Sequence, residues 1–254
     1  MKPLTRLLSL PRYLQDLRAY MRAPGAEPWS RVTLKPMLEE RTSSHGFDAH
    51  YVYLGAWAFR HITRACPPQH IDVAGQIGWV TCLASVTQVV FIDVRPFLGQ
   101  VENLESRAGS VLSLPFPDRS VSSLSCLHVA EHIGLGRYGD PIDPLGTRKA
   151  FAELSRVLAP GGRFYFVLPV GRPSVVFNAH RVHDPVTIEE WIRQEGLVLR
   201  EFAAVDDGGK FLPAASPPDM RNQKYACGMF LLERSAGTLP PALQNAPKLP
   251  TAGK

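Results

Sequence analysis

Apolar and polar positions alternate in blocks along the middle of the chain. Short apolar runs rich in β-branched residues are separated by stretches in which apolar residues recur every three or four positions. The first pattern is typical of buried strands and the second of amphipathic helices. We expect strands at 71–74, 88–93, 110–114, 121–129, 163–169, 197–205 and 225–233, and helices at 50–64, 79–85, 147–158 and 186–195.

Strands that alternate with helices in this way predict an α/β domain with a mostly parallel sheet. We place this domain at residues 46–234. Residues 1–45, which prolines interrupt, are expected to form a helical or irregular N-terminal leader. The tail, 235–254, is rich in Pro, Ala and Gly, and its low apolar content predicts disorder.

The leader carries leucines at the spacing of an amphipathic helix, and its polar face includes Arg6, Arg12 and Arg18. Two interpretations remain open: the helix packs on a protein domain, or it contacts a membrane surface weakly. The apolar run Leu7–Leu10 is too short for the core of a signal peptide. No stretch is long enough for a transmembrane span.

Composition changes this picture little. The chain of 254 residues has 28 Lys and Arg against 23 Asp and Glu, a net charge of +5. This excess is scattered along the sequence, so we expect no nucleic-acid binding. Its four cysteines form no CxxC pair or zinc-type Cys/His cluster, which favours free thiols in a reducing, cytoplasmic compartment.

The chemistry of an open parallel sheet is expected at the carboxyl ends of its strands. The first strand is followed by Asp72-x-Ala74-Gly75-x-x-Gly78. Small residues there let the backbone approach a ligand closely, and the amides at a helix start can face an anionic group. A tight structural turn explains the same residues almost as well.

A carboxylate, Asp93, ends the second strand about twenty residues after this loop. That spacing is typical of an acidic residue that accepts hydrogen bonds from both hydroxyls of a ribose. The alternative is a turn cap formed with Arg95 and Pro96. We favour ribose binding because the spacing and the strand context both agree.

Three motifs follow one another in the second half of the chain: LPFPD at 114–118, HVAEH at 128–132 and AFAELSRVLAPGGRFYFVLP at 150–169. Together they resemble class I S-adenosylmethionine (SAM)-dependent methyltransferases. EHIGLGRYGDPIDPLG at 131–146, with HYVYLGAWA at 50–58, resembles an uncharacterised methyltransferase-like family often found beside polysaccharide-building enzymes. The resemblance covers residues 45–205. It implies a Rossmann-like fold with seven strands, the last antiparallel, and helices on both faces.

The resemblance also implies where SAM binds. Asp72, Ala74, Gly75 and Gly78 would border its methionine part, and Asp93 would hold the ribose. Ser110 stands where many relatives have an Asp that contacts the adenine amino group. His128, at the end of the fourth strand, would face the cofactor.

Methyl transfer needs an oriented nucleophile and often a base for its proton. Histidine suits this role because its ordinary pKa lies near neutrality. We select Glu131, His132 and His180 as catalytic candidates, with Glu131 orienting a histidine. A structural role remains open for each histidine taken singly.

Polar residues in the loops after the fourth and fifth strands are candidates for substrate recognition, since loops on a rigid scaffold often carry function. A lid or a packed structural loop explains the first of these loops equally well. His132, Asp140 and Asp143 have irregular spacing, so we predict no metal site. The substrate candidates are Arg137, Tyr138, Asp140, Asn178, Arg181 and His183.

We predict a SAM-dependent methyltransferase that acts on a hydroxyl of a small molecule or saccharide. The alternative is a non-catalytic domain that kept the fold and binds a partner. A nicotinamide oxidoreductase is excluded because the chain lacks GxGxxG after its first strand. Ala74 and Gln76 replace glycines of a standard nucleotide loop and favour the alternative, whereas Asp93 favours the enzyme.

Overall fold

The computed structural model describes residues 2–43 and 45–236, with the side chains of 2–8 excepted. The predicted disordered tail therefore lies almost wholly outside the described residues. The chain divides into two compact units, Met1–Phe47 and Asp48–Lys254. Within the described residues, no helix is both long and apolar enough to cross a membrane.

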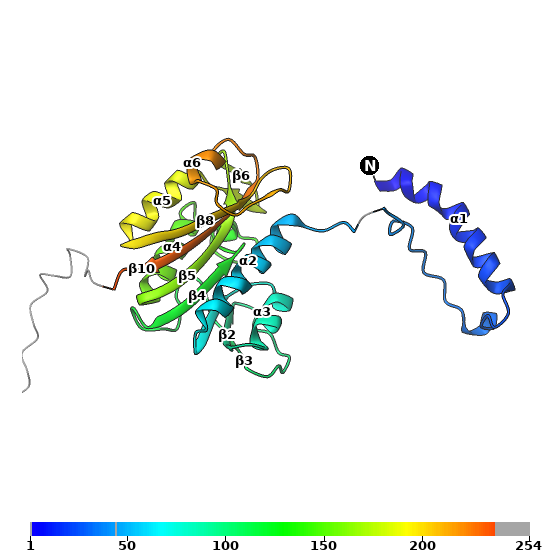
Figure 1. Cartoon of the computed structure of the whole chain (residues 1–254), viewed down its shortest axis with the longest axis horizontal. Helices are drawn as coiled ribbons and strands as arrows, with labels where there is room; N and C mark the ends of the chain where they lie inside the picture. The colour runs from blue at the N-terminus through cyan, green and yellow to red at the C-terminus, as the bar shows by residue number, and fades with distance from the viewer. Residues whose placement is uncertain (1, 44, 237–254) are drawn as a thin grey trace, which may run out of the picture. The chain divides into compact units, whose positions relative to one another are not determined.

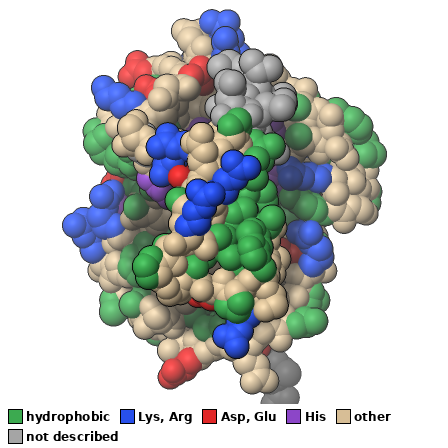
Figure 2. All heavy atoms as spheres, turned by 90° about the vertical axis from the view of Figure 1, so that its right-hand side faces the viewer, with side chains coloured by type: hydrophobic (Ala, Val, Ile, Leu, Met, Phe, Trp, Pro, Cys, Tyr) green, Lys and Arg blue, Asp and Glu red, His purple; other side chains and the backbone are tan. Residues whose placement is uncertain are grey.

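The first unit contains helix α1 (Lys2–Arg22) and a single 3-10 turn, η1 (Trp29–Arg31). Pro11 lies inside α1, and Arg22 lies in its last turn. Leu10 and Leu14 of α1 are exposed within the structure. Figure 2 shows Lys and Arg side chains (blue) at several places on the face that it draws.

The second unit is built on one eight-stranded sheet with the order β3-β2-β1-β4-β5-β10-β8-β9. Neighbouring strands among β1–β5 are parallel, and β10 is antiparallel to both β5 and β8. This arrangement confirms the predicted Rossmann-like sheet with an antiparallel last strand. The additional eighth strand is the two-residue β9, which pairs with β8 at one edge.

The strands are β1 (Gln69–Val73), β2 (Gln88–Asp93), β3 (Leu104–Ala108), β4 (Val121–Leu127), β5 (Leu158–Val170), β8 (Leu197–Val205), β9 (Phe211–Leu212) and β10 (Ala226–Arg234). A separate hairpin pairs β6 (Ser174–Val176) with β7 (His180–Val182). The helices are α2 (Ala49–Ala65), α3 (Ile77–Ala84), α4 (Gly146–Val157), α5 (Pro185–Gln194) and α6 (Pro217–Met220), with a 3-10 turn η2 (Ala130–His132).

Two predicted features differ from the structure. The third strand is not at 110–114 but at Leu104–Ala108. Its exposed, charged residues mark an edge strand and hide the apolar signal on which the prediction relied. Ser110 instead forms an isolated bridge with Ser113. The second difference is the histidine-rich stretch after β5, expected to be irregular, which contains the β6–β7 hairpin.

Helices cover both faces of the sheet (Figure 1). One core contains buried residues of α4 and α5, among them Phe151 and Ile188. The other contains residues of α2 and α3, among them Trp57 and Leu83. Because both faces are covered, the central strands are largely buried. The polar residues within them, such as Ser123 and Ser125 of β4, are buried as well.

Candidate functional site

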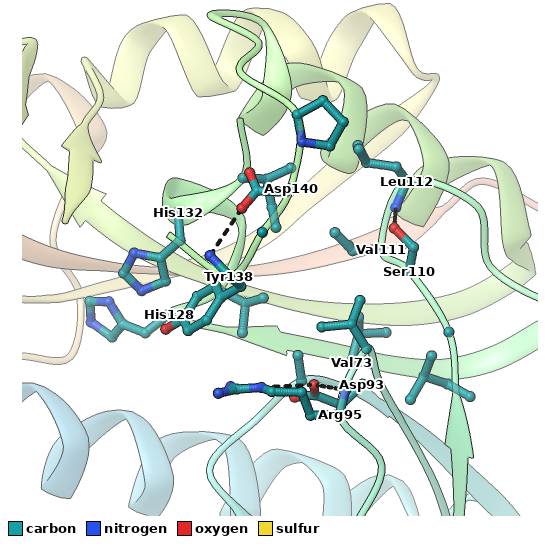
Figure 3. Close-up of a pocket in the computed structure, with 18 residues that line it drawn as sticks. Val73, Asp93, Arg95, Ser110, Val111, Leu112, His128, His132, Tyr138 and Asp140 are labelled. Carbon is teal, nitrogen blue, oxygen red and sulfur yellow. Dashed lines mark hydrogen bonds and ion pairs between the residues drawn. The ribbon is translucent and has the colours of Figure 1, made fainter. Parts of the chain in front are cut away.

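Two neighbouring cavities open at the carboxyl ends of β1, β2 and β4. The first has a volume of about 400 Å³ and a largely apolar wall, whereas the second has a volume of about 560 Å³. Figure 3 shows His128 and His132 at one end of the first cavity and Ser110 at the other. The residues that line both cavities are Ala74, Asp93, Arg95, His128, His132 and Tyr138.

The backbone of the loop after β1 is held in place by the carboxylate of Asp72. Asp72 is fully buried and accepts a hydrogen bond from the Gly75 amide at 2.9 Å and another from the Ser125 hydroxyl at 2.5 Å. Burial raises the pKa of Asp72 to about 7. A Cβ on Gly75 would collide with the Asp72 carboxylate. Asp72 thus shapes the loop from below and lines neither cavity.

Ala74, Gly75 and Gln76 are the loop residues that reach the cavities, followed by Ile77 of α3. Ala74 has a φ of 56°, in the left-handed region that disfavours a side chain. Such strain persists where the surroundings enforce it and often occurs at functional sites. Gly78 lies exposed in the first turn of α3, and it lines neither cavity.

Asp93 lies at the end of β2 and faces both cavities while remaining only 9% exposed. Its Oδ1 accepts a hydrogen bond from the Arg95 amide at 2.7 Å. The geometry is therefore compatible with both interpretations of Asp93, the turn cap and the ribose ligand. One oxygen caps the turn, and the carboxylate as a whole still borders the cavities.

Apolar side chains from β1, β2 and the segment after β3 line the first cavity, including Val73, Ile92 and Val111. Ser110 joins this wall, and its hydroxyl accepts a hydrogen bond from the Leu112 amide at 3.2 Å. An apolar slot with a few polar groups is the usual form of a pocket for a planar ring.

A buried ion pair lies where β4 ends. His128 Nδ1 and Glu131 Oε1 are 2.8 Å apart, and both side chains are almost completely buried. Burial opposes charge on His128, but Cys227 and Glu131 outweigh it and raise the pKa of the imidazole. Burial likewise opposes charge on Glu131, yet the hydrogen bond and charge of His128 lower its pKa. Each group thus favours the charged form of the other.

This pair leaves two polar atoms without partners among the described residues. His128 Nε2 and Glu131 Oε2 are buried and form no hydrogen bond. An unsatisfied buried polar atom costs free energy, so each such atom calls for an explanation. His128 also has a φ of 57°, a second strained position at the carboxyl edge of the sheet.

The other two histidine candidates flank this pair. His132 Nδ1 lies 2.6 Å from the Ala179 carbonyl oxygen, so it donates its proton there. The Nε2 atom then keeps a lone pair, and it lies 3.7 Å from Glu131 Oε1. His180 lines the second cavity, and burial lowers its pKa. Both imidazoles can therefore accept a proton.

The glycine-rich loop after η2 is organised by Asp140. Its carboxylate accepts hydrogen bonds from the amides of Gly134 at 2.5 Å and Tyr138 at 3.2 Å. Tyr138 projects over the cavities, where the Arg95 guanidinium lies 4.7 Å from its ring centre. Arg137 lines the second cavity and donates to the Ala179 carbonyl at 3.0 Å.

Three of the proposed substrate residues lie outside both cavities. Asn178 is exposed beside the β6–β7 hairpin turn. Arg181 is buried and donates to three backbone carbonyls, including that of Ile133 at 2.5 Å. His183 packs 5.4 Å from the Trp191 ring, and burial lowers its pKa to about 4. Their placement favours structural roles for Arg181 and His183.

The sequence did not identify three aromatic residues near the second cavity. Tyr51 and Tyr225 line it, and His50 stacks on His128 with ring centres 5.4 Å apart. These residues come from α2 and the start of β10, far from the motifs in the sequence. His50 and Tyr51 belong to the segment HYVYLGAWA at 50–58, which contributed to the family resemblance but was not assigned to the site.

Comparisons with known proteins agree with this architecture. A family described as "Caenorhabditis protein of unknown function, DUF268" matches residues 119–194. The uncharacterised methyltransferase YcgJ of Bacillus subtilis (strain 168) is 37% identical over 95 residues, which are 35% of this chain. The match spans only 33% of that relative's length.

Solved structures share the fold at low sequence identity. The [4+2]-cyclase SpnF is 14% identical with a TM-score of 0.56, covering 78% of this chain and 86% of SpnF. The geranyl diphosphate C-methyltransferase of Streptomyces coelicolor A3(2) is 14% identical with a TM-score of 0.51, covering 72% and 79%. These structures and this chain share a Rossmann-like α/β fold.

Proposed function

We propose that this protein is a SAM-dependent methyltransferase that transfers the methyl group to a hydroxyl of a small molecule, with a saccharide as the preferred class. The observation that carries the proposal is the placement of Asp93. Its carboxylate ends β2 and borders both cavities, which Ala74 also lines, while Gly75 lines the second. A carboxylate at this position of a Rossmann-like sheet accepts hydrogen bonds from a ribose.

We assign the ribose and adenine of SAM to the first cavity and the acceptor to the second. Asp93 would hold the ribose, and the apolar wall with Ser110 would hold the adenine in the first cavity. Ala74 and Gly75 would border the methionine part, where the loop permits close approach. When bound, SAM supplies an electrophilic methyl group on a sulfonium. The geranyl diphosphate C-methyltransferase, whose fold is similar, has been solved in complex with S-adenosylhomocysteine. This supports the assignment by analogy.

The second cavity provides groups for the acceptor. The Nε2 atom of His132 is placed to take the proton of an acceptor hydroxyl, because its Nδ1 proton is held by Ala179. His180 lines the same cavity and is a second base candidate. Arg137 and Tyr138, with the backbone that Asp140 organises, would orient the acceptor. Several hydrogen-bonding groups on one wall suit a saccharide, which carries several hydroxyls.

Calorimetric titration of the full chain with SAM and S-adenosylhomocysteine tests the cofactor. Micromolar binding, about −8 kcal/mol, is the expected result. Asp93→Ala should weaken it at least tenfold, about 1.4 kcal/mol, since charged hydrogen bonds to the ribose are lost. Asp219→Ala, an exposed site away from the cavities, is the matched control.

Unchanged affinity in the Asp93 variant would remove its ribose role. If neither compound binds the intact protein, the enzyme proposal fails. The non-catalytic alternative would then stand, a domain that binds a partner through the same fold. SpnF, a cyclase with this fold, illustrates that the fold alone does not fix the activity. If SAM binds, methylation of a panel of saccharides is the next assay.

A further inference from the structure

Three side chains with soft or borderline donor atoms meet beside the second cavity. His50 lies in the first turn of α2, His128 directly follows β4, and Cys227 is the second residue of β10. Because β10 runs antiparallel to β5, its first residues pair with the last residues of β5. The start of β10 is therefore brought to the carboxyl edge, where β4 also ends.

The donor atoms of these residues are close together. One donor atom from each lies within 4.8 Å of the other two. Among the described residues this is the one group of three or more His, Cys, Asp or Glu side chains that meets such a distance criterion. Cys227 and His128 are buried and His50 is half-buried. The triad is thus shielded from bulk solvent.

The hydrogen bonding of His128 fits the role of a metal ligand. Its Nδ1 lies 2.8 Å from Glu131 Oε1, and its Nε2 is buried without a hydrogen-bond partner. A ligating histidine commonly donates its other ring N–H to a carboxylate, which fixes the tautomer and the ring orientation. Since Nδ1 is taken by Glu131, Nε2 is the His128 nitrogen left for a metal.

We propose that His50, His128 and Cys227 bind a zinc ion, with Glu131 as the positioning residue for His128. A thiolate and two imidazoles form a donor set that suits zinc, and three protein ligands leave a tetrahedral ion with one open position. The site departs from the sequence prediction of no metal, because its residues are separated by up to 177 positions, from 50 to 227.

Closing the triad around an ion requires a modest movement. Zinc bonds of about 2.0–2.1 Å to nitrogen and 2.3 Å to sulfur set the donors about 3.3–3.6 Å apart in a tetrahedron. His50 is the ligand that can move, since it is the least buried of the three and lies at a helix start. The open position would take water or, resting on the proposed function, the acceptor hydroxyl.

The test is zinc binding by the full chain, purified and stripped with a chelator. Zinc is titrated against a chromophoric competitor, and cobalt is substituted to detect thiolate-to-metal charge transfer. We expect one zinc per chain and a thiolate–cobalt band. Cys227→Ser and His50→Gln should each weaken zinc at least about 100-fold. Glu131→Gln should weaken it about 10–100-fold, as loss of an outer partner does.

Two variants provide matched controls. Cys126→Ser changes another buried cysteine, and His183→Gln changes another histidine whose buried Nε2 lacks a partner. Neither belongs to the triad, so both should keep full zinc affinity. His50→Gln carries the test if the buried Cys227→Ser variant does not fold.

Failure to bind zinc, or equal affinity in the triad variants and the controls, would overturn the proposal and leave a hydrogen-bonded cluster. The assay contains no SAM, so its outcome is independent of the test of cofactor binding. Zinc binding without SAM binding, or the reverse, would separate the two proposals.

Discussion

Two regions of the sheet's carboxyl edge treat their buried polar atoms differently. Below the loop after β1, Asp72 accepts from Gly75 and Ser125, and both ring nitrogens of His70 pair with serine hydroxyls at 2.7 and 2.8 Å. At the end of β4, His128 and Glu131 pair with each other and leave one buried atom each without a partner.

This difference suits a structural role for the region below the β1 loop and a ligand-binding role for the end of β4. The region below the β1 loop is complete within the chain, so its polar residues hold backbone in place. The β4 end is incomplete among the described residues, since His128 Nε2 and Glu131 Oε2 have no hydrogen-bond partner there, and a bound group would supply one. The catalytic and metal-binding proposals both fall at the incomplete region, whereas the region around Asp72 presents Ala74 and Gly75 to a ligand.

The sharpest way to break the comparison is to remove Glu131. Glu131→Ala leaves the His128 imidazolium buried without its carboxylate, and loss of one partner of a buried pair costs about 3–5 kcal/mol. The free energy of unfolding, from urea denaturation, should fall by this amount. Glu102→Ala, at an exposed glutamate, should stay within about 0.5 kcal/mol. A small effect at Glu131 would mean that the pair is not ionic.

The Asp72 region makes a prediction about pH. Burial raises the folded pKa of Asp72 to about 7, against about 3.9 in an unfolded chain. Between these values the folded state binds the extra proton, so stability is highest at the acidic end and is lost as pH rises towards 7. Asp72→Asn should remove this loss and gain roughly 2–4 kcal/mol relative to wild type between pH 4.5 and 8.

Denaturant unfolding of both proteins across this pH range measures the effect. An Asp72→Asn profile parallel to that of the wild type would show that Asp72 stays ionised when folded. His183 is a useful internal contrast, because burial lowers its pKa to about 4. Its contribution is present above about pH 6.5 and is lost as pH falls through 4, the opposite direction from Asp72.

Much of this edge could be predicted from sequence, because strand ends are local features. The bounds of β2 and β8 match the expected strands. Asp93 and the loop residues Ala74 and Gly75 follow directly from the strand ends. The edge strand β3 was misplaced because Glu105 and Arg107 give it no apolar pattern.

The remaining part depends on contacts that the linear sequence does not display. Cys227 reaches His128 because β10 inserts antiparallel between β5 and β8, and His50 reaches it from the first turn of α2. Arg181 and His183 carry the same residue types as the proposed site groups, yet Arg181 donates to backbone carbonyls and His183 packs against Trp191. The sequence shows the residue types, but it does not show in which direction the side chains of the β6–β7 hairpin point.

Two glycines of the β1 loop sharpen the scaffold side of the comparison. Gly75→Ala places a Cβ against the Asp72 carboxylate, and such overpacking costs about 1–3 kcal/mol. Gly78→Ala meets no atom within 4 Å, and alanine in a helix gains up to about 1 kcal/mol over glycine. Thermal unfolding should therefore shift in opposite directions. Equal effects would show that the loop is not built on Asp72.

The smallest expected effect concerns ligand rather than stability. Ser110→Asp restores a charged acceptor on the wall of the first cavity, where the adenine is proposed to bind. A hydrogen bond to a charged group is stronger than one to a neutral group by about 1 kcal/mol, so SAM should bind about fivefold more tightly by calorimetry. Ser113→Asp, its bridge partner outside both cavities, should change nothing. If Ser110→Asp weakens SAM binding, the adenine does not lie on this wall.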